Sequence, residues 1–132
     1  MKDFSNQSLK QSAKKSTAYD CFGLIGQLFA SRNLAHLAHL NTTSYAEHKA
    51  LNSYYDSILD LTDTLAETYI GVYGRGVITI PGTALNDIRT HLKELRVEVA
   101  EHREYIKETN IQNIIDEILS LIDETNYLLT LK

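Results

Sequence analysis

The chain has 132 residues and a mass of 14.9 kDa, which fits one domain with a hydrophobic core of its own. Hydrophobic residues make up 43% of it and charged residues 23%, and one proline and six glycines leave long stretches free for helix. The formal net charge of −4 argues against electrostatic binding of nucleic acid by the whole surface, although charge is segregated along the chain.

Hydropathy argues against membrane and secretory segments. The sequence has no run of 18 apolar residues, and it does not open on a basic segment followed by an apolar one, so we expect neither a membrane span nor a secretory signal. We therefore expect a cytoplasmic protein. Cys21 is the only cysteine, and its apolar neighbours predict a buried side chain without chemistry.

The first 17 residues form a polar segment that we assign as a basic N-terminal tail, followed by a folded domain over residues 18–132. This composition is typical either of a leader without fixed structure or of an arm that contacts phosphates or a partner. DNA contact through the tail is therefore one expected interaction. Its basic residues are Lys2, Lys10, Lys14 and Lys15, against the single acid Asp3.

Two helices are predicted in the first half of the domain, from apolar residues that recur at helical spacing. The first is expected from Ala18 to about Leu40, and the second from about Tyr45 to Tyr73. Between them lies a small polar segment, and Glu47 follows Ser44 by three residues as in a capping box. The expected inward residues are Phe22, Ile25, Leu28, Phe29, Leu34, Leu37, Leu51, Tyr54, Tyr55, Ile58, Leu61, Leu65 and Tyr69.

A long crossover is predicted after the second helix, because Gly74, Gly76, Pro81 and Gly82 break helices and the β-branched residues 77–80 favour extended chain. Two further helices follow, at 83–108 and 111–131. Their expected inward residues are Leu85, Ile88, Leu92, Leu95, Val99, Ile106, Ile114, Ile115, Ile118, Leu121, Ile122, Leu128, Leu129 and Leu131.

This order of short, long and short connections predicts the topology. Short links make each helix pair antiparallel, and a long middle link that runs along the bundle is the connectivity of ferritin-like folds. The sequence therefore predicts an all-α, ferritin-like four-helix bundle, with a simple bundle or two coiled hairpins as alternatives.

A polar stripe runs beside the apolar face of the second helix, adjacent to its core side at about 100° per residue. Carboxylates and an imidazole in one line are ligands for Fe²⁺, Mn²⁺ or Zn²⁺, and the same stripe is also typical of a solvated helix face. Its members are His48, Asn52, Asp56, Asp60, Asp63 and Glu67.

Two histidines near the end of the first helix, His36 and His39, lie three residues apart and therefore on one face. Two imidazoles so placed either share a metal ion or serve as hydrogen-bonded residues at the edge of the core.

The stretch from His36 to Glu67 resembles the signature of the bacterial miniferritins, the DNA-binding proteins from starved cells. That family has a histidine late in its first helix, another early in its second, an acid four residues on and a later D-x-x-x-E pair. Here these are His36 or His39, then His48, then Asn52 in place of the acid, then Asp63 to Glu67. The segments 113–118 and 126–129 also look like the family's last helix.

The resemblance implies an iron-oxidising protein. In that family the histidines of one chain and the D-x-x-x-E pair of another bind iron across a twofold axis, and twelve chains close into a shell. Carried over, the metal ligands are His36 or His39, His48, Asp63 and Glu67, with Asn52, Asp56 and Asp60 as weaker candidates. The chain is then a homo-oligomer, at least a dimer, that binds ferrous iron, or zinc or manganese, and oxidises and stores it.

Two departures from the family pattern keep a second function open. Asn52 supplies a neutral amide where the family has a carboxylate, and the chain has no tryptophan, which commonly follows the family's first histidine. The alternative is a ferritin-like scaffold without ferroxidase activity that serves as a structural or interaction protein, such as a component of a phage or other viral particle.

Overall fold

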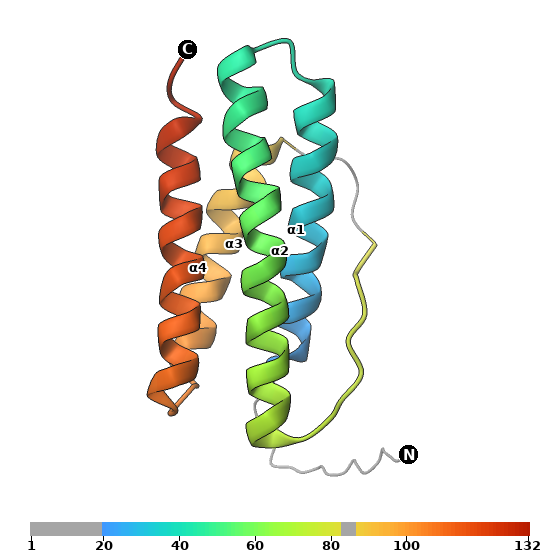
Figure 1. The fold of residues 1–132 in the computed structure, drawn as a ribbon, viewed down its shortest axis with the longest axis vertical. Coiled ribbons are helices and arrows are strands. Elements are labelled where there is room, and N and C mark those ends of the chain that lie inside the picture. Colours follow the sequence, from blue (N-terminus) through green and yellow to red (C-terminus); the bar gives the residue numbers. More distant parts are fainter. Residues whose placement is uncertain (1–19, 83–86) are drawn as a thin grey trace.

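The computed structural model describes residues 20–82 and 87–132, and within these ranges the chain forms four α-helices. They are α1 (Phe22–Asn41), α2 (Tyr45–Tyr73), α3 (Ile88–Arg103) and α4 (Thr109–Leu128) (Figure 1). The prediction of an all-α protein with four helices is confirmed. In this part of the chain no helix is both long and apolar enough to cross a membrane.

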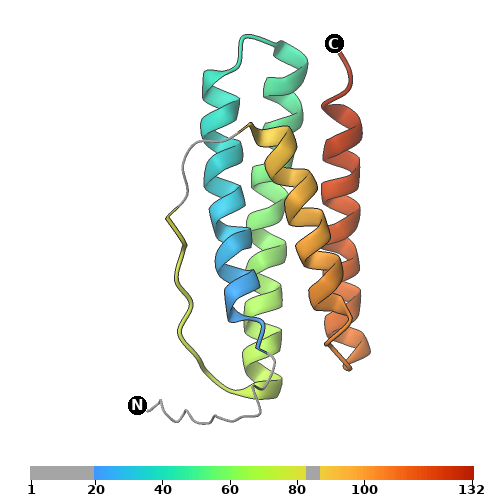
Figure 2. The same cartoon turned by 180° about the vertical axis from the view of Figure 1, so that it is seen from behind.

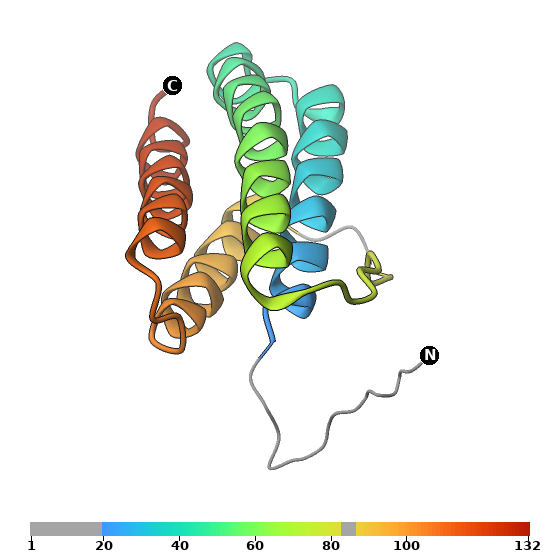
Figure 3. The ribbon, with the colours of Figure 1, turned by 60° about the horizontal axis from the view of Figure 1, so that its bottom comes forward.

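The four helices pack in a ring in which each contacts two others. α1 lies against α2 and α3, and α4 lies against the same two helices. α1 and α4 run toward one end of the bundle, while α2 and α3 run toward the other (Figures 1 and 2). The seam between α2 and α4 is therefore formed by antiparallel neighbours, as the view in Figure 3 also shows.

The link between α2 and α3 leaves the bundle and returns along its side. Gly74 ends α2 with a φ of 94°, a backbone conformation that favours glycine. Residues 74–82 form neither helix nor strand and run beside α1 (Figure 2). A Cβ atom at Gly26 of α1 would collide with the backbone oxygen of Thr79, so this glycine lets the segment lie directly on the helix.

One hydrophobic core fills the bundle, with fully buried side chains from every helix. Cys21 is buried within it, as expected. Two residues predicted to point inward are instead exposed, Leu37 at 43% and Leu131, which lies beyond the end of α4, at 46%. The largest buried side chains include Leu24, Leu28, Tyr54, Ile58, Leu92, Ile115 and Ile118.

The bounds of three helices differ from prediction. The first helix begins at Phe22 and the third at Ile88. The third is capped by Asp87, whose carboxylate accepts a hydrogen bond from the backbone N–H of Thr90. The third helix ends at Arg103 instead of 108, and the fourth runs from Thr109 to Leu128. The residues predicted as helix at 83–86, including Leu85, lie outside the described ranges.

The second helix has the bounds that the sequence predicted, Tyr45 to Tyr73. The Ser44 hydroxyl accepts a hydrogen bond from the backbone N–H of Glu47 at 3.2 Å, which is one half of the predicted capping box. The other half is replaced, because the Glu47 carboxylate accepts instead from the hydroxyl of Thr42 at 2.8 Å.

Candidate functional site

The three histidines of the predicted metal site lie close together where α1 passes into α2. His39 Nδ1 is 2.7 Å from the backbone oxygen of His48, and His48 Nδ1 is 3.0 Å from the backbone oxygen of His39. Because a carbonyl oxygen only accepts, each Nδ1 must carry its proton and donate. The two imidazoles are thus held by a reciprocal pair of hydrogen bonds across the turn.

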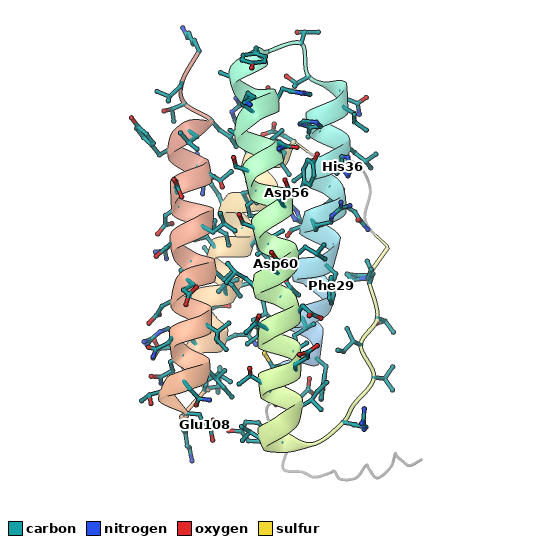
Figure 4. All side chains as sticks on the ribbon, in the orientation of Figure 1. Phe29, His36, Asp56, Asp60 and Glu108 are labelled. Carbon is teal, nitrogen blue, oxygen red and sulfur yellow. The ribbon has the colours of Figure 1, made fainter. Side chains whose placement is uncertain are left out.

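The same two rings lie face to face. Their centroids are 3.6 Å apart and their planes differ by 19°, and His39 is only 8% exposed. His36 extends the aromatic cluster by stacking on Tyr55, with centroids 4.2 Å apart (Figure 4). The Tyr55 hydroxyl in turn donates to the side-chain oxygen of Asn52, so the predicted weak ligand Asn52 is engaged within the cluster.

This stacked geometry does not suit a shared metal ion. An imidazole binds a metal through an Nε2 lone pair that lies in the ring plane, at about 2.0–2.1 Å. The planes of the two imidazoles are nearly parallel and their centroids are 3.6 Å apart. No single point therefore lies in both ring planes at the metal–nitrogen distance from both Nε2 atoms. His39 and His48 therefore cannot both bind one ion unless the stack opens.

The acidic half of the predicted site lies elsewhere on α2. Asp56, Asp60, Asp63 and Glu67 are all exposed, so the stripe faces outward instead of lying beside the core (Figure 4). Asp63 follows His48 by 15 residues, which corresponds to about 22 Å along the helix. Within one chain the two halves do not meet.

Consistent with that separation, the described residues contain no group of three or more histidine, cysteine, aspartate or glutamate side chains placed to hold a metal ion. A centre shared between two chains stays a prediction, as does the choice between iron, zinc and manganese. The four lysines predicted to contact DNA lie in residues 1–19, outside the described ranges.

A second group of titratable side chains lies on α3. His102 Nε2 is 3.9 Å from the Glu98 carboxylate, and burial raises the pKa of Glu98 and lowers the pKa of His102. About two helical turns before Glu98 on the same helix, burial likewise lowers the pKa of His91. The Nε2 atom of His91 has no hydrogen-bond partner among the described residues.

The sequence did not predict two separate hollows of about 350 Å³ each, which both lie along the seam between α2 and α4. One lies near the start of α2 and the end of α4, lined by Tyr45, Ala46, Lys49, Ala50, Ser53, Leu128 and Leu131. The other lies further along, lined by Leu61, Asp116, Glu117, Ser120, Leu121 and Glu124. We call the two together the α2–α4 groove.

The helices that form this groove are strongly acidic. They carry nine carboxylates, and Lys49 is their only lysine or arginine. Three of the carboxylates pair with arginines of α3: Glu47 with Arg89 at 3.1 Å, Asp116 with Arg103 at 2.6 Å, and Asp123 with Arg96 at 2.8 Å. The Arg103 guanidinium lowers the pKa of Asp116. The remaining six have no ion-pair partner among the described residues: Asp56, Asp60, Asp63, Glu67, Glu117 and Glu124.

Comparison with known proteins gives a family but no activity. The model of a family of unknown function, DUF5856, matches residues 39–129. An uncharacterized 14.6 kDa protein from the mobD-ri intergenic region of Enterobacteria phage T4 is 34% identical over 125 residues, which cover 92% of this chain and 94% of the phage protein. No solved structure matches. These matches give no support to membership of a ferritin family.

Proposed function

This chain belongs to the DUF5856 family, and we propose that it is a small helical interaction protein of phage-infected cells, which acts by binding another macromolecule. The observation that carries the proposal is the exposure of large apolar side chains beside the α2–α4 groove. Tyr45 is 75% exposed and Leu131 46%, and both line the hollow near the start of α2. Clustered exposed apolar groups next to a hollow are typical of surfaces that bind a partner.

The topology supports a ferritin-like scaffold as the framework for this role. α1 and α2 form one antiparallel pair, α3 and α4 form the other, and a long segment beside α1 joins them (Figures 1 and 2). That is the arrangement expected when the middle connection runs along the bundle. In this proposal the scaffold has no ferroxidase centre, because the stacked histidines connect α1 to α2 and the acidic stripe is solvated.

The proposal is tested by purifying the tagged full-length chain from infected cells and measuring its intact mass by native mass spectrometry. We expect a discrete assembly that contains another macromolecule at fixed stoichiometry, at physiological salt. A matched tagged chain with Tyr45→Ser and Leu131→Ser should lose that partner and keep its own fold by circular dichroism. Recovery of this chain alone, or of homo-oligomers alone, in both preparations would contradict the proposal.

A second candidate function is iron binding between two copies of the chain, with iron as the substrate. Asp63 and Glu67 favour it, because they lie one helical turn apart, are exposed and have no ion-pair partner among the described residues. One imidazole of a second copy, from His36, His39 or His48, would complete the ligand set. The resemblance to miniferritins implies an assembly of up to twelve chains.

An anaerobic Fe²⁺ titration followed by oxygen, together with a mass measurement of the assembly, separates the two candidates. Iron oxidation faster than in buffer that is lost in Glu67→Gln, but kept in the exposed control Glu101→Gln, would support the second. No saturable iron binding in an assembly of any size would exclude it.

A further inference from the structure

The shape and charge of the α2–α4 groove identify the kind of partner that it suits. We infer that the groove docks an amphipathic helix of another protein, with an apolar row that enters the groove and lysine and arginine on the side of that row that faces α4. The inference rests on the proposed function and adds the chemistry of the partner and the surface that binds it.

The floor of the groove is apolar and has helical spacing. On α4 the half-buried residues Leu121 and Leu128 each line one hollow and lie seven positions apart, in the register of a helix that packs against another helix. On α2 the facing residues Ala46 and Ala50 are small, so the backbone of a docked helix can approach closely. Such a floor fits side chains of a third helix at i and i+7.

The length of the groove sets the length of the partner. Ala50 lines one hollow and Leu61 the other, and their separation of 11 residues is about 16 Å along α2. A helix that fills both hollows, with one turn beyond each, therefore needs about 18 residues.

The charge of the groove selects a basic helix. Asp116, Glu117 and Glu124 of α4 line the hollow beside Leu61. No carboxylate of α2 lines either hollow, and Lys49 is the charged residue that lines the other one. A second copy of this chain docked through the same face would bring like charges together, and a nucleic acid would be repelled. Lysines and arginines on the side of the docked helix that lies over α4 would instead face Glu117 and Glu124.

The experiment uses the full-length protein and a synthetic 18-residue helical peptide. Leucines form one face of the peptide and lysines fill the other positions. Its control has the same composition in an order that scatters the leucines around the helix. We expect the amphipathic peptide to bind at least tenfold more tightly than the scrambled one. In ¹⁵N–¹H spectra the shifted amides should map to α2 and α4, around Ala50, Leu61 and Leu121.

Matched charge reversals locate the contact. Glu117→Lys with Glu124→Lys on α4 should weaken binding at least tenfold. Glu94→Lys with Glu101→Lys on the exposed side of α3 changes the net charge equally and should weaken it less than twofold. All four positions are exposed, so each protein should keep its fold.

Four results with the peptides would overturn the inference. The first two are equal binding of the scrambled peptide and equal loss in the two reversal proteins, since either shows attraction by net charge alone. The third is amide shifts confined to other helices. The fourth is peptide binding that appears only after residues 1–17 are deleted, which would make the tail the occupant of the groove. A partner found by native mass spectrometry that binds elsewhere would refute this inference and leave the proposed function standing.

Discussion

The stacked pair of His39 and His48 gives the most detailed prediction, because every contact that it makes is defined. His39→Ala removes one hydrogen bond, worth about 0.5–1.5 kcal/mol net, and the stacking on His48, worth about 0.5–1.5 kcal/mol. It also removes the edge contacts of His39 with His36 and Tyr55. The free energy of unfolding should therefore fall by about 1–3 kcal/mol. For a chain of this size that corresponds to roughly 4 °C in Tm per kcal/mol. His48→Ala should have a similar effect, since its hydrogen bond and its stacking on His39 are the reciprocal ones.

A double-mutant cycle separates the two contributions. Each hydrogen bond runs from a ring to the partner's backbone carbonyl, which alanine retains, so the two hydrogen-bond losses should add. Only the ring contact requires both side chains. The coupling energy of the cycle, measured by urea unfolding followed by circular dichroism, should therefore be about 0.5–1.5 kcal/mol.

The same measurements distinguish a structural contact from a metal site. If the histidines only join α1 to α2, the free energy of unfolding should be equal with EDTA and with Zn²⁺. The reasoning is refuted if Zn²⁺ raises the Tm of the native chain but not of His48→Ala. A coupling energy near zero would refute it as well, since the stack would then contribute nothing.

Three further perturbations test other parts of the fold. Gly26→Ala should lower the free energy of unfolding by about 1–3 kcal/mol, because its new Cβ atom meets the backbone of the crossover. Gly23→Ala should be neutral or stabilising, because its new Cβ atom meets nothing within 4 Å. Urea titrations of both variants compare the two effects. Tyr54→Phe removes a buried hydrogen bond of 2.8 Å to the Ser31 hydroxyl and should cost about 1 kcal/mol in thermal unfolding; no change in Tm would mean that this bond is not formed. Burial lowers the pKa of His91, so the folded state favours the neutral ring, and stability is lost as the pH falls below the ordinary pKa of 6.5. His91→Gln should therefore lose less stability than the native chain between about pH 7.5 and 5. Equal losses would contradict this.

Most of the fold was predictable because it depends on local signals. Ser44 and Gly74 bound α2 at its two ends, and helical periodicity identified the core residues between them. Periodicity alone did not locate the end of α3. Ile106 is buried as predicted, but it lies in a turn, where its N–H donates to the backbone oxygen of Arg103 at 3.2 Å. A buried apolar residue in a tight turn has the same sequence signature as one in a helix.

The candidate site was predictable only in part, because its chemistry depends on three-dimensional contacts. His39 lies late in the first predicted helix and His48 early in the second, which places both at the same end of the bundle. Residue spacing does not predict how the two rings face each other. The reciprocal hydrogen bonds need the backbone geometry of the α1–α2 turn. The α2–α4 groove was missed for a similar reason, since Leu61 and Leu121 are 60 positions apart and line one hollow only after the helices pack.

The central claim, that the α2–α4 groove binds another protein, is tested most directly by photo-crosslinking in infected cells. A benzophenone side chain is placed at Ser53, which is exposed and lines the groove, or at Glu101, which is exposed on α3. We predict a crosslinked adduct of defined mass with a second protein from position 53 and none from position 101. Adducts from both positions alike, or adducts only between copies of this chain, would contradict the account.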